Sequence, residues 1–233
     1  SGNMTSVADI NSFVRNFAYD GNGNQTGTSY LWTDPSGQLP DRMVSTSTVY
    51  NDAGQVVSTT DPNGNTSTTK YNDIGKPYQT TDILGNTTTT VYDDRGNVVE
   101  TQYPDGTSSQ TVYDVEGRAF ITADRHVAGE AANGTRTIYD IIGRVVRTER
   151  LSNVVITVNV NGNSVSSSLS SVPSVVSFAS STYDKAGRVL SSTDAAGAVT
   201  RYEYDAAGRT TAVIDALGNR TEYEYDNAGR QTL

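Results

Sequence analysis

The sequence contains no cysteine, which excludes disulfide bonds and thiolate metal sites. Phenylalanine and methionine are scarce too, and hydrophobic residues make up only 35% of the 233 positions, below the usual share for a soluble domain. No apolar run approaches the length of a membrane-spanning helix. We therefore expect neither a thick aliphatic core nor membrane insertion.

Basic clusters are also lacking, and the formal net charge is −9. Nucleic acids and anionic membranes are held mainly by Lys and Arg that neutralise phosphates. The sequence therefore predicts no nucleic-acid partner. Low hydrophobicity combined with net charge is also typical of disordered chains, but such chains have no need of the fixed period described next.

Tyrosine, in contrast, recurs at a fixed spacing. A Tyr starts each unit, a Gly follows four residues later, and most units are 21 residues long, which indicates a repeat architecture. Tyr19 and Gly23 form an early, looser copy. The residues expected to define the repeat structurally are Tyr50 and Gly54, Tyr71 and Gly75, Tyr92 and Gly96, Tyr113 and Gly117, Tyr139 and Gly143, Tyr183 and Gly187, Tyr204 and Gly208, and Tyr225 and Gly229.

A second turn signal lies half a unit later, as in Asp215-Ala-Leu-Gly218-Asn219. Asp accepts hydrogen bonds from the backbone two residues on, and Gly supplies the positive φ that closes the loop. The intervening segments are six to seven residues long and rich in β-branched residues, which favours strands. Each unit thus reads turn, strand, turn, strand, and the predicted fold is all-β, made of tandem antiparallel β-hairpins.

Side-chain alternation predicts which face of the sheet is inner. In the last full unit Thr221 and Tyr223 share one face, whereas Glu222 and Glu224 share the other. We therefore expect the Tyr face to point inward and the charged face to meet solvent.

The period divides the chain into four parts. We expect an irregular lead-in over 1–18, of which 1–4 resemble a cloning remnant, and repeats over 19–150 and 183–233. The segment 151–182 lacks both Tyr and charged residues, and it is either a pair of degenerate repeats, which we favour slightly, or a Ser-rich insertion that projects from the sheet.

Five extra residues interrupt the period between Asp124 and Thr135, and they predict a longer hairpin tip. His126, the only histidine, lies there with Asp124 and Glu130. A single His without a placed Ser or metal partner is weak evidence for catalysis, so an exposed loop His is the better interpretation.

The residues after the glycines could form an anion-binding stripe. The alternative, which the acidic surroundings favour, is that each guanidinium bridges to turn carboxylates on neighbouring hairpins, such as Asp184 or Asp205. The residues concerned are Lys76, Arg118, Arg144, Arg188, Arg209 and Arg230. The Tyr-Asp pairs themselves read as a packed ring and a turn cap, because nine copies of a catalytic pair make no sense.

Two segments, which begin at Asp20 and Asp61, resemble the start of a calcium loop. Neither has the acidic residue that should close the loop, since Leu31 and Asn72 stand there, so β-turns are expected. Tyr30 and Trp32 are candidates for stacking on a sugar, although aromatics there more often plug the end of a sheet. We assign no catalytic residue, cofactor or metal ligand.

Tyr-Asp-x-x-Gly-Arg, followed by Thr-Asp-x-x-Gly-Asn-x-Thr and the next Tyr-Asp, resembles the RHS or YD repeat. The clearest copies are Tyr71 to Tyr92, Tyr183 to Tyr204 and Tyr204 to Tyr225, and the resemblance covers about residues 45–150 and 180–233. The family includes bacterial Rhs and wall-associated toxins, toxin-complex shell subunits and teneurins, in which one antiparallel sheet spirals into a hollow shell. The resemblance implies an open, partial turn of such a spiral here, because about nine units are too few to close a shell.

The same resemblance implies a function. The first hypothesis is a non-enzymatic wall segment of a secreted or cell-surface, bacterial RHS-type protein, whose partners are the rest of a larger polypeptide or its cargo. The second is a module that binds carbohydrate or protein on the sheet face or edge, and open edges also make edge-to-edge self-association plausible. An enzyme is the third, weakest hypothesis, and it would need polar groups that converge around His126.

Overall fold

The computed structural model describes residues 5–8, 14–162 and 164–232, and these residues form strands and turns without any helix. The suspected cloning remnant at 1–4 lies outside the described residues. The all-β, tandem-hairpin prediction is confirmed. The chain divides into two compact units, of which the first holds residues 1–91 and 102–105 and the second residues 92–101 and 106–233.

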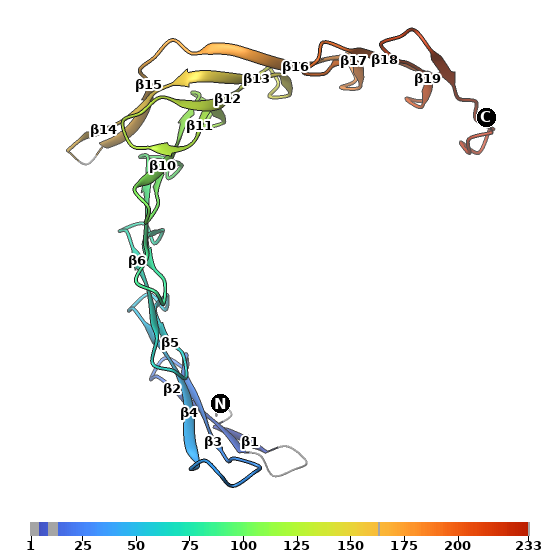
Figure 1. Cartoon of the computed structure of the whole chain (residues 1–233). Helices are drawn as coiled ribbons and strands as arrows, with labels where there is room; N and C mark the ends of the chain where they lie inside the picture. Colours follow the sequence, from blue (N-terminus) through green and yellow to red (C-terminus); the bar gives the residue numbers. More distant parts are fainter. Residues whose placement is uncertain (1–4, 9–13, 163, 233) are drawn as a thin grey trace. The chain divides into compact units, whose positions relative to one another are not determined.

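In the first unit, consecutive strands pair antiparallel in chain order from β1 to β8 (Figure 1). These strands are β1 (Ser6–Ala8), β2 (Val14–Tyr19), β3 (Gln25–Trp32), β4 (Arg42–Tyr50), β5 (Val56–Thr60), β6 (Thr66–Tyr71), β7 (Pro77–Thr81) and β8 (Thr87–Tyr92). Residues 14–18 thus belong to a strand rather than to an irregular lead-in, because β2 has β1 and β3 as hydrogen-bonded neighbours.

The second unit continues in the same manner with one interruption. Its strands are β9 (Val98–Gln102), β10 (Thr107–Tyr113), β11 (Ala119–Val127), β12 (Ala132–Tyr139), β13 (Val145–Val154), β14 (Ile156–Asn161), β15 (Ser164–Leu169), β16 (Ser174–Tyr183), β17 (Val189–Thr193), β18 (Val199–Tyr204), β19 (Thr210–Ile214) and β20 (Arg220–Glu222). β13 pairs directly with β16, whereas β14 and β15 pair with each other as a separate two-stranded sheet.

The hairpin formed by β14 and β15 therefore emerges between two strands that are neighbours in the sheet. It packs back on the second unit, where Ile156 joins a buried cluster that includes Ile121, Leu151 and Val154. The boundaries expected for the four sequence segments stay a prediction, but the strand pairing around 151–182 is that of an inserted hairpin.

The longer hairpin tip expected at 124–135 is confirmed. β11 and β12 pair with each other only as far as Ala123 and Gly134, so residues 124–133 lie beyond the last pair of this hairpin. β11 and β12 are nevertheless nine and eight residues long, and the loop between them covers only 128–131. His126 accordingly lies on β11, opposite Ser108 of β10, and it is half-buried instead of exposed on a loop. The two sides of the tip are extended because each pairs with a different neighbour, His126 and Val127 with β10 and Ala132 with Val154 of β13.

The expectation of an inward Tyr face is wrong for the middle of the second unit. Arg136 and Tyr139 of β12 point to different faces of the sheet. Ile121 is paired with Arg136, so it lies on the face without the Tyr rings, yet it is only 1% exposed. The β14–β15 hairpin covers this face, so the core lies there and not beneath the tyrosines. A charge is buried on that face too, since Glu149 is 3% exposed and accepts hydrogen bonds from Arg136 (2.6 Å) and Arg147 (2.7 Å).

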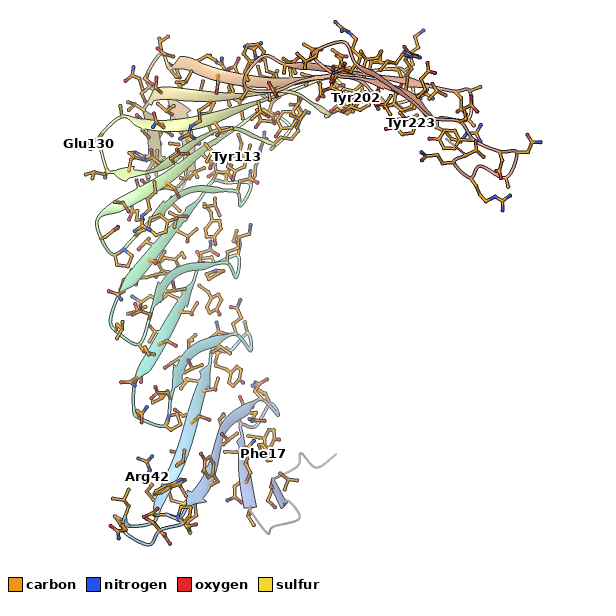
Figure 2. All side chains as sticks on the ribbon, turned by 45° about the vertical axis from the view of Figure 1, so that its right-hand side comes forward. Phe17, Arg42, Tyr113, Glu130, Tyr202 and Tyr223 are labelled. Atoms are coloured by element: carbon orange, nitrogen blue, oxygen red, sulfur yellow. The ribbon has the colours of Figure 1, made fainter. Side chains whose placement is uncertain are left out.

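The last repeats keep the expected alternation. Tyr202 and Tyr223 lie on one face and are half-buried (Figure 2), while Arg201 and Glu203 of the other face are exposed. No strand there is covered by a second layer, so the face with the rings is shielded only by its own side chains.

Candidate functional site

The feature that recurs most regularly is the Tyr-Asp-x-x-Gly turn, and the copy at 184–188 shows its geometry. The Asp184 N–H donates to the Arg188 carbonyl (2.9 Å) and the Gly187 N–H donates to the Asp184 carbonyl (3.1 Å). One carboxylate oxygen of Asp184 accepts the N–H groups of Ala186 and Arg188, both at 2.9 Å. Gly187 closes the turn with a φ of 88°. Asp and Gly thus satisfy the turn internally, as the sequence predicted.

The residue after the glycine links each turn to the next. Arg188 donates from Nε to the second carboxylate oxygen of Asp184 (2.6 Å), and its guanidinium lies over the Tyr204 ring, 4.8 Å from the centroid. From Nη1 it donates to the main-chain carbonyl of Asp205 (3.2 Å). The predicted bridge to a neighbouring carboxylate is therefore corrected, because the carboxylate belongs to the same turn and the neighbour contributes a carbonyl and a ring.

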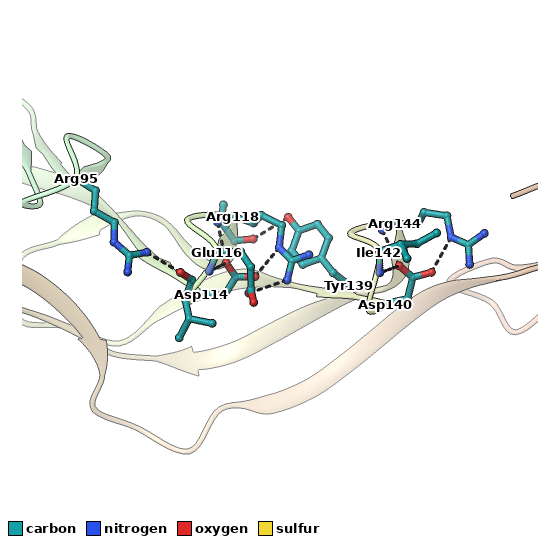
Figure 3. A network of polar contacts seen from close by, with 10 residues as sticks. Arg95, Asp114, Glu116, Arg118, Tyr139, Asp140, Ile142 and Arg144 are labelled. Atoms are coloured by element: carbon teal, nitrogen blue, oxygen red, sulfur yellow. Dashed lines mark hydrogen bonds and ion pairs between the residues drawn. The ribbon is translucent and has the colours of Figure 1, made fainter.

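This arrangement repeats along the turn edge of the second unit (Figure 3). Arg118, Arg144 and Arg209 each pair with the Asp four residues earlier and lie over the next repeat's Tyr, at 4.4, 4.5 and 4.8 Å from the centroid. Arg230 pairs with Asp226 in the same way, and its side chain is 81% exposed. Each guanidinium is neutralised within its own turn, so an anion-binding stripe is disfavoured.

The tyrosine completes the link in the opposite direction. Tyr204 donates its hydroxyl proton to the main-chain carbonyl of Val189, where the preceding hairpin begins (2.8 Å). The equivalent acceptors are the carbonyls of Gln25 for Tyr50, Val56 for Tyr71, Val98 for Tyr113, Ala119 for Tyr139, Val145 for Tyr183 and Thr210 for Tyr225. We call this combination of Tyr, Asp, Gly and Arg contacts between successive turns the turn ladder.

In the first unit the turn ladder has uncharged members. At the turn beginning at Asn51, the Asn51 side chain replaces the carboxylate and Gln55 replaces the arginine. Gln55 donates from Nε2 to the carbonyl of Gly75 in the next turn (2.8 Å). The link survives as a hydrogen bond, although ion pairing and stacking of a guanidinium on the ring are replaced by a neutral contact.

The second type of turn, Asp-x-x-Gly-Asn, also closes on itself. In the turn that begins at Asp215, the Asn219 side chain donates to one carboxylate oxygen (2.7 Å) and the Asn219 N–H to the other (2.8 Å). These donors, with the side chain of Asn219 first, hold the pKa of Asp215 below its ordinary value.

Both calcium-like segments are β-turns, as expected. The turn at Asp61 is of this second type, whereas the turn at Asp20 follows Tyr19 and so stands at the position of the first type. The carboxylate of Asp61 accepts from Asn63 and Asn65, and that of Asp20 accepts from Asn22 and Asn24. The carboxylate oxygens are therefore already engaged by the turn, and the part of the chain that the structure describes holds no group of three or more potential metal ligands of the His, Cys, Asp or Glu type.

The residues around His126 do not converge on a reactive centre. Its Nδ1 lies 2.7 Å from the main-chain oxygen of Asp124, while the carboxylate of Asp124 pairs with Arg150 (3.1 Å for one of its contacts). Glu130 lies in the exposed turn between β11 and β12. His126 and Asp124 thus each have a structural partner of their own, and Glu130 is exposed to solvent.

Tyr30 and Trp32 were expected to plug the end of a sheet. They lie instead in β3, which has β2 on one side and β4 on the other. The guanidinium of Arg15 lies 5.9 Å from the Tyr30 centroid and that of Arg42 lies 5.3 Å from the Trp32 centroid. One face of each ring is therefore occupied by a cation, which leaves less ring surface for a sugar.

Sequence reasoning missed the contact that holds the inserted hairpin. Asp94 accepts the hydroxyl of Ser164 (2.5 Å) and the N–H of Val165 (2.8 Å), and Ser167 donates to the Thr111 carbonyl (2.6 Å). These donors lower the pKa of Asp94, with the Ser164 hydroxyl first. The turn is closed by the side chain of Asp93, so that of Asp94 is left for other contacts. In the sequence, only the acidic residue type at this position hinted at such a contact.

Comparison with a family model supports the repeat assignment for residues 183–233. The family model described as RHS Repeat matches residues 183–219 and 204–233. No curated protein matches the sequence. Among solved structures, the chain is similar to a chain of the Tc holotoxin pore of Photorhabdus luminescens (18% identity, TM-score 0.49, 94% of this chain and 12% of that one). It is also similar to TcdB2-TccC3 without its hypervariable C-terminal region (16% identity, TM-score 0.47, 94% and 13%). This chain spans about an eighth of their length.

Proposed function

Given that residues 183–233 match the RHS Repeat model, we propose that the chain is a non-enzymatic structural module, a wall segment of a larger RHS-type polypeptide. The turn ladder is the observation that carries the proposal. Every residue type that the repeat holds in place, Tyr, Asp, Gly and the residue after it, is used to close a turn or to attach one turn to the next. The repeated residues thus serve to keep the sheet continuous from one hairpin to the next.

The wall function follows from how such a sheet gains its stability. Each hairpin contacts chiefly its neighbours, so stability is approximately a sum of repeat and nearest-neighbour contributions, as in other repeat proteins. A sheet of this kind can be lengthened by units without a new core. We propose that the remaining polypeptide and its cargo are the partners of this wall, and that the parent protein is secreted or displayed at a bacterial surface.

Deletion of whole units tests the proposal. Removal of residues 50–91 joins Val49 to Tyr92 and takes out two complete 21-residue units. The new junction again places a Tyr at the start of a turn. The shortened protein should therefore fold, and its remaining strands should keep their pairing register. The measurements are far-UV circular dichroism and amide exchange across the junction.

A deletion that ignores the period is the matched control. Removal of residues 50–81 joins Val49 to Asp82, which places the wrong turn after β4 and moves side chains out of register. This variant should lose protection in the first unit. The wall proposal fails if the in-period deletion unfolds the chain while single substitutions of buried residues leave it folded.

A further inference from the structure

β13 and β16 are the two longest strands, and they pair with each other beyond the end of β17. The part of β16 beyond β17, residues 174–179, therefore has one open side, which we call the half-edge. Residues 174–179 pair with β13 through contacts such as Phe178 opposite Glu149. Pairing with β17 begins only at Ser180, opposite Thr193. In the described part of the chain no strand pairs with the other side of residues 174–179.

This half-edge is apolar and uncharged. Its sequence, Ser-Val-Val-Ser-Phe-Ala, leaves Val175, Val176 and Phe178 exposed by 43, 65 and 37%. A bulge leaves Val176 without a partner in β13, so the regular part of the edge is Ser177–Ala179. Natural sheets usually protect open edges with charged side chains, and β20 carries Arg220 and Glu222 in this way. Residues 174–179 carry no such charge.

A groove runs beside the half-edge. It has a volume of about 430 Å³ and is lined by residues 175–178, by Arg147 and by the turn tip at 195–197. Arg147 is the one charged residue of this lining, and it donates to Glu149 (2.7 Å) while its guanidinium lies 3.7 Å from the Phe178 ring centroid. The lining therefore offers apolar surface and backbone groups but no charge without a counter-ion.

We propose that the groove binds an extended, uncharged peptide segment with alternating apolar side chains, added to β16 as a strand. The open backbone edge selects an extended segment, because only an extended chain can match its donors and acceptors. The exposed valines and Phe178 select apolar side chains, and the neutralised Arg147 gives no advantage to a charged partner. The proposal does not depend on the wall function, since it concerns one edge rather than the repeat.

A synthetic peptide tests this proposal on the whole chain. The probe is fluorescein-labelled Thr-Val-Thr-Phe-Thr-Val-Thr, and its anisotropy should rise saturably below about 1 mM protein. Val176→Lys places an ammonium group on the edge and should weaken binding about tenfold or more. Val160→Lys is the matched control, because Val160 is 70% exposed on β14 and lines no part of the groove, and it should bind the probe as the parent chain does.

A second peptide, with Pro in place of the central Phe, separates strand pairing from simple adsorption, since Pro lacks the N–H that the ladder needs. It should not bind. The proposal is overturned if the Pro peptide binds equally well, if Val176→Lys leaves affinity unchanged while urea unfolding shows a folded variant, or if the parent chain shows no binding. Self-association of the parent chain in sedimentation, abolished by Val176→Lys, would also overturn it by assigning the edge to a second copy.

Discussion

At the scale of the residue, the turn glycines have a conformational task that other residues perform poorly. Gly64 has a φ of 85°, and a Cβ built on it would meet no atom within 4 Å. Space is therefore not the constraint, and the requirement comes from the left-handed backbone itself.

Gly64→Ala should consequently destabilise the protein by about 1–2 kcal/mol, the cost of holding an L-residue in the left-handed region. Gly21→Ala is the matched control, because Gly21 also has open space but no positive φ. Urea unfolding of both variants checks the difference. Equal midpoints for the two would show that the turn does not impose its φ on residue 64.

The turn aspartates are the second residue-scale feature, and they make stability depend on pH. The pKa of Asp184 is lowered, first because the Arg188 N–H donates to its carboxylate, and that of Asp215 because the Asn219 side chain does. The pKa of Asp34 falls to about 2, with the Ser36 hydroxyl as the largest cause.

A carboxylate whose pKa is lower in the folded state stabilises that state above its unfolded pKa and loses this effect as the pH falls through the folded pKa. The urea midpoint should therefore stay constant from about pH 7 to pH 5 and fall steadily below about pH 4. A midpoint that does not change down to about pH 2 would contradict the role assigned to the turn carboxylates.

At the scale of the element, the inserted hairpin depends on a contact made at its tip. Asp94 receives two hydrogen bonds from residues 164 and 165, and a buried cluster that includes Ile156 fixes the other end. The tip should therefore loosen separately from the base, since they are held by different interactions.

Asp94→Ala should speed amide exchange at residues 164–168 while exchange in β13 is unchanged. Asp73→Ala is the matched control, because Asp73 occupies the same position of the turn that follows Tyr71 and has an exposed side chain. Hydrogen exchange followed by mass spectrometry checks both. Unchanged exchange at the tip in Asp94→Ala would show that the apolar cluster alone docks the hairpin.

At the scale of the whole molecule, the two units differ in what stabilises them. No described residue of the first unit is buried, whereas the second holds a buried cluster around Ile121 and Leu151. The second unit also has the charged form of the turn ladder. Four of its guanidinium groups lie over a Tyr ring, and such a contact is worth about 0.5–1 kcal/mol at an exposed site.

The first unit should therefore open more readily than the second. Amides of β5 to β8 should exchange at least about tenfold faster than those of β11 to β13. Because the comparison is made within one sample, hydrogen exchange of the intact chain serves as its own control. Equal protection of the two sets of strands would mean that neighbour contacts alone determine stability.

The sequence by itself determined where the chain turns and where it is extended. A turn such as 184–188 is closed by atoms within five residues, so Asp and Gly at fixed spacing were enough to place it. The same local logic placed the calcium-like segments as turns. The repeat also predicted the all-β class, because strands must fill the six to seven residues between turns.

Only the tertiary structure decided what each face and each guanidinium contacts. Arg188 binds within its own turn and reaches the next repeat through a carbonyl and a ring, and Ile121 is buried on the face opposite the tyrosines. The inserted hairpin bonds to Asp94, some 70 residues earlier. Such contacts depend on which strands become neighbours in the sheet, and β13 beside β16 is a pairing that no local pattern specifies.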